Sequence, residues 1–145
     1  MIIKRSKDFE PAPEGLHRGV CVDHYTTLVK GGQFDATPTD KLKLVFELAA
    51  TMSDGRQFIA TTPLLGLSLH PKSNLSKLLD GWGMEVGDEF DTELIIARPA
   101  LCMVKHREAS DGRIFADVSH VLPLPEGSAP LSPSGNYVRR KDRTE

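Results

Sequence analysis

The chain of 145 residues lacks the short motifs by which many enzymes and metal proteins are identified. It holds two cysteines, Cys21 and Cys102, each inside an apolar run, and no CxxC pair, so a zinc ribbon is not indicated and two buried free thiols are expected. There is no HExxH, P-loop, GxSxG or GxGxxG motif, and no catalytic residue, cofactor or metal is predicted. No apolar stretch approaches the roughly 20 residues of a membrane helix, and no signal peptide is visible. These absences favour a cytoplasmic, non-enzymatic protein.

The chain also has few aromatic side chains and only a small net charge. The chain has six Phe, two Tyr and one Trp, and its formal net charge is -2. A surface that stacks nucleic-acid bases must therefore come from a short set of rings, and tight duplex binding is not favoured. The charge is unevenly distributed, because residues 80–93 carry six acidic side chains and no Lys or Arg. The remainder of the domain is mildly basic, which leaves room for a positive face.

Hydrophobic periodicity predicts a mostly β domain with one helix. Strands are expected at residues 16–28, 41–50, 56–62, 100–107 and 113–122. A helix is expected to begin near Ser73 or Asn74, to bury Trp82 on its apolar side and to stop at Gly81 or Gly83, and a short helical turn is expected at 90–97. Three strands, a helix and two strands is the order of the OB-fold, a five-stranded Greek-key barrel with one helix between strands three and four. A generic α+β sheet with one covering helix is the alternative.

The sequence also predicts which face of two strands points into the core and which terminal residues lie outside the barrel. Alternation places Leu42, Leu44, Phe46 and Leu48 on one face of the second strand. The same reasoning places Ile114, Ala116, Val118, His120 and Leu122 on one face of the last strand. Residues 1–14 are expected to be a flexible leader and residues 15–124 the barrel. Residues 125–145 are rich in Pro, Ser and Gly with a basic end, and a disordered tail is expected there.

Four segments resemble one group of proteins. They are Phe9-x-Pro11-x-Pro13-x-Gly15, the strand Gly19 to Asp23, the strand Leu42 to Leu48 and the helix start Lys72 to Leu79. This pattern resembles small proteins encoded in bacteriophage replication and recombination regions, which are regarded as OB-fold single-stranded DNA-binding proteins. The resemblance implies sequence-tolerant binding of single-stranded DNA in the cytoplasm of a bacterial host, with a phage recombinase or polymerase as a further partner. Pairing through an open strand edge would give a homodimer.

Candidate binding residues follow from the OB-fold expectation and are not carried over from that group. OB-folds bind across strands two and three and the flanking loops, and single strands are held by phosphate contacts and base stacking. We therefore predict a nucleic-acid-binding set of Phe34, Lys41, Lys43, Arg56, Phe58, Lys105, Arg107 and Arg113. Three alternatives stay open: Phe58 in the core, Phe34 as a loop anchor, and the basic group at residues 105–113 as a solvated hairpin tip. Tyr25 is compatible with either a core or a surface position.

Two other functions are compatible with the same sequence. The low charge and few aromatics suit a protein-interaction module that bridges phage replication or recombination enzymes. A structural virion component is the third possibility, since small barrels serve many functions.

Overall fold

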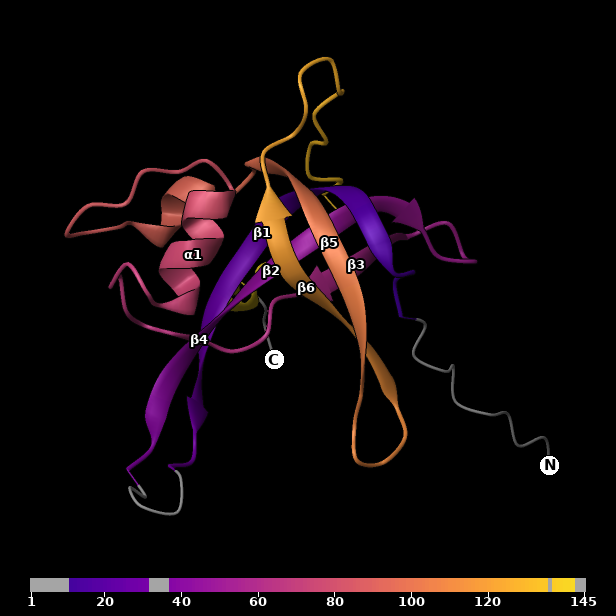
Figure 1. The fold of residues 1–145 in the computed structure, drawn as a ribbon. Coiled ribbons are helices and arrows are strands. Elements are labelled where there is room, and N and C mark those ends of the chain that lie inside the picture. Colours follow the sequence, from indigo (N-terminus) through magenta and orange to yellow (C-terminus); the bar gives the residue numbers. More distant parts are fainter. Residues whose placement is uncertain (1–10, 32–36, 136, 143–145) are drawn as a thin grey trace.

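A computed structural model describes residues 11–31, 37–135 and 137–142, and they form a mostly β structure with one α-helix (Figure 1). The elements in chain order are β1 (Gly15–Val29), β2 (Thr39–Thr51), β3 (Gln57–Thr61), β4 (Leu65–Gly66), α1 (Asn74–Gly81), η1 (Thr92–Ile95), β5 (Pro99–Glu108), β6 (Ile114–Leu122) and η2 (Arg140–Asp142). The expected strands are all present, and their ends agree with the expected ones to within two residues. In the described part of the chain, no helix is both long and apolar enough to cross a membrane.

Five strands close into a barrel in the order β1-β5-β6-β3-β2, and β2 pairs with β1 again. Four of the five contacts are antiparallel, whereas β3 and β6 run parallel and meet at the single pair Thr61–Asp117. The closure depends on β1, which pairs with β5 in its first part and with β2 along the rest. Gly19 lies where the two pairings overlap, and a Cβ atom there would come within 2.9 Å of Cys102 Sγ. A mostly β chain with a closed five-stranded barrel is thus confirmed.

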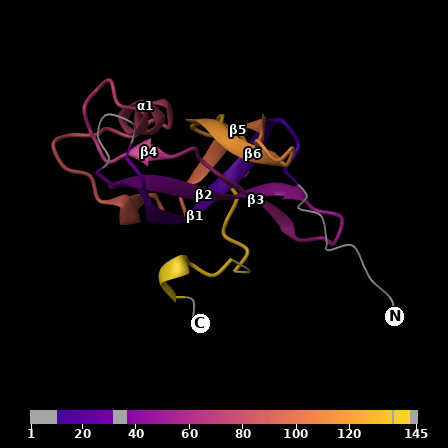
Figure 2. The ribbon, with the colours of Figure 1, turned by 90° about the horizontal axis from the view of Figure 1, so that it is seen from below.

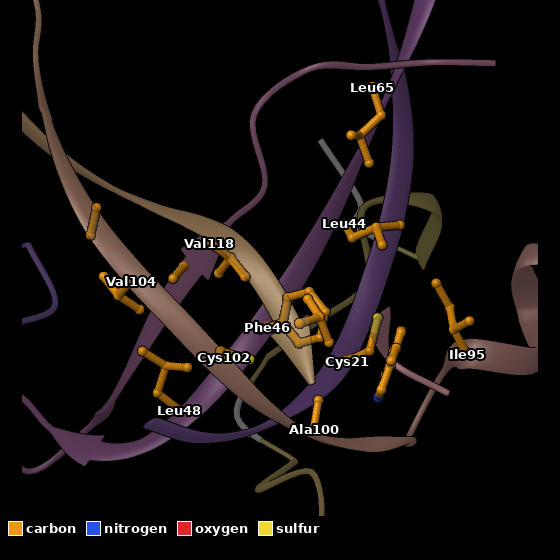
Figure 3. Packing of buried hydrophobic residues seen from close by; sticks show 14 of the residues in the cluster. Cys21, Leu44, Phe46, Leu48, Leu65, Ile95, Ala100, Cys102, Val104 and Val118 are labelled. Carbon is orange, nitrogen blue, oxygen red and sulfur yellow. The ribbon is translucent and has the colours of Figure 1, made fainter. Parts of the chain in front are cut away.

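Inward-pointing side chains from opposite strands fill the barrel (Figure 3). The predicted inner face of β2 is confirmed, because Leu42, Leu44, Phe46 and Leu48 are all at most 2% exposed. The two cysteines are buried and free, as expected, and desolvation raises the pKa of each to about 12. These thiols therefore act as small apolar groups rather than nucleophiles.

Helix α1 packs against β6 and β4 and adds its apolar side to the core. It begins after Ser73, whose hydroxyl accepts a hydrogen bond from Ser76 N and so satisfies a free donor of the first turn. Trp82 follows the helix and is 1% exposed, with its indole N–H donating to Pro99 O at 3.0 Å. The expected core position of Trp82 is confirmed.

The predicted inner face of β6 is confirmed at Ala116 and Val118, but Ile114 is 36% exposed and the prediction is wrong again beyond Val118. The register between β5 and β6 shifts because Val104 pairs with Val118 while Met103 pairs with His120. The extra residue is a β-bulge that reverses the alternation, so Val121 points inward and His120 and Leu122 are exposed.

Both terminal segments also differ from expectation where they are described. Within the expected leader, Ala12 is 1% exposed and its carbonyl lies 2.7 Å from His106 Nε2 on β5. Within the expected disordered tail, residues 129–135 and 137–142 lie against the outer side of β1 and β2, facing away from β5 and β6 (Figure 2). We call these described residues, 129–135 and 137–142, the C-terminal segment. Disorder was predicted because Pro, Ser and Gly are frequent in residues 125–145, and composition does not reveal the contacts that Leu131, Ser134, Tyr137 and Arg139 make with the barrel.

Candidate nucleic-acid interface

A groove of about 550 Å³ crosses the outer face of the barrel where β3 meets β6. Its walls come from β2, β3, β5 and β6, and the residues that line it are Lys43, Ile59, Thr61, Arg107, Phe115, Ala116 and Asp117. The alternation of each strand explains the lining. On β2, Leu42 and Leu44 point into the core, so Lys43 between them points outward. On β6, Ala116 and Val118 point into the core, so Phe115 and Asp117 point outward. Cations and a ring from separate strands thus meet on one surface.

The half-buried ring of Phe115 is flanked by two guanidinium groups. The Arg107 Cζ atom lies 5.0 Å from the ring centroid, and the Arg113 Cζ atom lies 5.4 Å from it. Each contact is a cation–π interaction of the kind worth about 0.5–1 kcal/mol at an exposed site. Such a stack offers both charge for a phosphate and flat surface for a base.

Aspartates hold the groove arginines in place. Arg107 Nε is 2.8 Å from Asp117 Oδ2, and Arg113 Nε is 2.6 Å from Asp111 Oδ2. The hydrogen bonds from Arg113 lower the pKa of the Asp111 carboxyl, so it stays ionised and the pair persists over the neutral range. The exposed Arg113–Asp111 pair contributes about 0–1 kcal/mol, so a phosphate can replace Asp111 at modest cost, whereas the Asp117 side chain that pairs with Arg107 is only 13% exposed. Within the described part of the chain, Lys43 and Lys105 form no ion pair.

The predicted binding residues separate into three groups. Lys43 and Arg107 line the groove, Arg113 joins them through Phe115, and Lys105 lies on β5 opposite Asp117. Lys41 and Arg56 lie outside the groove, Lys41 beside β4 and Arg56 in the turn before β3, where its guanidinium is 2.7 Å from Asp54. Phe58 is 5% exposed and belongs to the core, so its ring is not available for stacking. Phe34 lies outside the described residues.

Phe115 is the groove residue that the sequence prediction missed. The signal was present, because a strand that buries Ala116 and Val118 must turn Phe115 outward, beside arginines at 107 and 113. The prediction chose Phe58 because it lies on the expected third strand, but that ring points into the core.

A second charged cluster joins the C-terminal segment to β1 and η1. Asp23, 1% exposed, accepts hydrogen bonds from His24 N, Tyr137 OH, Arg139 Nε and Arg140 N. Burial opposes ionisation of Asp23, but these four donors outweigh it and lower the pKa of the carboxyl below its ordinary 3.8.

Arg139 extends this cluster to Glu93 on η1. Its two terminal nitrogens each donate to a Glu93 oxygen at 2.8 Å, a bidentate pair. These bonds lower the pKa of Glu93 to about 2 and raise the pKa of Arg139 further above its usual range. His24 Nε2 lies 3.0 Å from the same carboxylate. A small pocket of about 120 Å³, lined in part by Glu47, Ser134 and Tyr137, adjoins this cluster. The hydrogen bonds of the cluster anchor the C-terminal segment to β1 and η1.

Comparison with known proteins does not assign this chain to a family: no protein-family model and no curated protein matches it. Across residues 11–31, 37–135 and 137–142, no three His, Cys, Asp or Glu side chains are grouped so that they could hold a metal ion. The groove beside Phe115 is therefore the surface on which a functional proposal can be built.

Proposed function

We propose that this chain is an OB-fold protein that binds single-stranded DNA with little sequence preference, in the phage replication or recombination setting its sequence resembles. One observation carries the proposal: Lys43, Arg107 and Phe115 converge from three strands on one groove of the outer face.

The strand order supports the OB-fold part of this proposal. A five-stranded Greek-key barrel with a helix after its third long strand is the OB arrangement, and here α1 follows β3 and the short β4. OB-folds bind oligonucleotides on the face of strands two and three and between the flanking loops. The groove lies over β2 and β3, beside the β5–β6 hairpin.

The chemistry of the groove supports the ligand. Two cations from different strands, Lys43 of β2 and Arg107 of β5, line the groove together with one carboxylate, Asp117, and cations of this kind hold the phosphates of a single strand. The ring and guanidinium planes of the groove can stack with any base, because every base has a π-face. Neither contact reads base edges, so binding is expected to tolerate sequence.

Anisotropy titration with a fluorescent oligo-dT at low salt tests the proposal. Phe115→Ala is expected to weaken binding by at least about fivefold, because base stacking is worth about 1–3 kcal/mol. Arg113→Ala is expected to weaken it several-fold through loss of charge and ring support.

The chain offers a matched control for Arg113. Arg56 sits in the same Asp-Gly-Arg turn, and in each turn the arginine N–H and Nε bond the two oxygens of the aspartate two residues earlier. Arg56 is outside the groove and should be replaceable by Ala with less than a twofold change. Flat anisotropy for the unmodified protein with both DNA and RNA would refute the proposal, and equal effects of both arginine variants would move the site.

A protein-interaction module is the second candidate, and a different surface favours it. An apolar hollow of about 320 Å³ lies between α1 and β6, and exposed Leu64 and Leu122 line it. A chain that binds no nucleic acid but retains partners after nuclease treatment would support this candidate.

A further inference from the structure

The C-terminal segment covers an apolar strip on the outer face of β1 and β2. Leu131 and Tyr137 pack there against Val20, Val22 and Val45. The segment is thus a second layer over the barrel, and it ends beside the part of β2 that carries Lys43.

The same segment supplies hydrogen-bond donors to two buried carboxylates on the outer side of the barrel, and to Asp23 it also supplies the positive charge of Arg139. Glu47 is 2% exposed and accepts hydrogen bonds of 2.7 Å from both the backbone N–H and the hydroxyl of Ser134. Asp23 accepts three of its four hydrogen bonds from Tyr137, Arg139 and Arg140. Without the segment, this face would present two bare negative charges next to the proposed binding groove, and these would repel a phosphate chain.

The segment also adds a cation and a ring contact of its own. The Arg140 Cζ atom lies 4.0 Å from the centroid of the Tyr25 ring, and Arg140 is itself exposed. Tyr25 is paired with Lys43 across β1 and β2, so the two side chains are neighbours on the same face. Lys43 therefore connects two arginine–aromatic stacks, one at Phe115 and one at Tyr25.

We propose that the strand-binding path continues from the groove past Lys43 to the Arg140–Tyr25 stack, and that the C-terminal segment is a built part of the binding surface. This inference rests on the proposed function and names a second contact region for the same ligand. Five strands span four spacings of about 4.8 Å, so the path is roughly 19 Å along the curved face. A path of that length holds several nucleotides, in keeping with the about 4–16 that one OB-fold covers. A segment that merely covered the site would have the opposite effect on affinity.

The test compares Arg140→Ala with Lys141→Ala against oligo-dT of increasing length. Arg140→Ala removes the stack and keeps the backbone bond to Asp23, and Lys141 is an exposed cation one position away, with no ring contact among the described residues. Arg140→Ala is expected to weaken binding of a twelve-nucleotide strand at least threefold. The affinity of the same variant for a four-nucleotide strand should stay within twofold of that of the unmodified protein. Lys141→Ala should change either affinity by less than twofold.

Truncation after Ser128 provides an independent measurement. Loss of the segment is expected to weaken long-strand binding at least as much as Arg140→Ala does, and circular dichroism checks that the barrel remains folded. Tighter binding by a folded truncated chain, or equal affinities for Arg140→Ala and the unmodified protein at every length, would overturn the inference.

If Phe115→Ala weakens binding in that same series, the proposed function stands while the extended path fails. If the unmodified protein binds no strand at all, the proposed function itself fails.

Discussion

Asp23 shows how one side chain can hold a whole segment in place. It is a buried carboxylate with four donors, three of which come from residues more than a hundred positions later in the chain. A buried charge is tolerated only when it is paired and hydrogen-bonded, and here the partners come from the segment that it anchors.

Asp23→Asn is expected to destabilise the protein by on the order of 2–3 kcal/mol. The substitution removes the charge opposite half-buried Arg139 and replaces one acceptor oxygen by a donor group. Urea unfolding measures the loss. Asp111→Asn is the matched control, because that carboxylate also bonds an arginine but is exposed at a hairpin, and its unfolding midpoint should stay near that of the unmodified protein. Equal midpoints for both variants would contradict the anchoring role of Asp23.

Residue-level prediction from the sequence succeeded where alternation was regular. The inner face of β2 follows from period two alone. The inner face of β6 could not be predicted beyond Val118, because a bulge has no signature in hydrophobicity. Lys43 and Arg107 were among the predicted binding residues and both line the groove, but the choice between Phe58 and Phe115 depended on which way each ring points.

At the scale of elements, the C-terminal segment is held by two kinds of contact that respond differently to pH. Its apolar contacts to the valines of β1 and β2 do not titrate. Its polar contacts depend on ionised Asp23 and Glu93, whose pKa values are both lowered. Disorder was predicted for this segment because local composition does not show that Tyr137 and Arg139 will bond to Asp23 and Glu93, which are distant in the sequence.

Acid is expected to loosen the C-terminal segment while the barrel persists. Glu93 has its pKa lowered to about 2 from an ordinary 4.5, chiefly by hydrogen bonds from Arg139, so its contribution is complete above pH 4.5 and is lost as the pH falls toward 2. Asp23 adds a loss in the same direction below its ordinary 3.8. The amide resonances of Ser134 and Arg140, followed by NMR between pH 6 and about 2, should shift or broaden before those of β2.

Glu93→Gln separates the contribution of this carboxylate from general acid unfolding. The variant lacks the titrating group, so its segment should be looser at neutral pH and change less between pH 4.5 and 2. The same acid profile in Glu93→Gln and the unmodified protein would show that Glu93 does not control the segment.

At the scale of the whole molecule, the proposed path lies across the weakest closure of the barrel. β3 and β6 meet at one residue pair, and the groove lies over this junction. The five strands were predictable because each has its own local pattern. The residue pair that closes the barrel was not predictable, because a single parallel pair between residues 61 and 117 leaves no local trace in the sequence. The OB-fold itself was inferred only by analogy, from strand count and helix position.

The weak net charge of the molecule leads to a measurable salt dependence. A protein with a net charge of -2 has no general attraction to DNA, so the salt dependence of its DNA affinity should report only the cations at the binding site. Three phosphates neutralised by Lys43, Arg107 and Arg113 predict a slope of log K against log salt of roughly -2, since single strands give about -0.7 for each phosphate. Raising NaCl from 50 to 200 mM should then weaken oligo-dT binding roughly twentyfold, and Arg107→Ala should make the slope shallower by about 0.7. A slope near zero would mean that the groove does not contact phosphates, whatever else it binds.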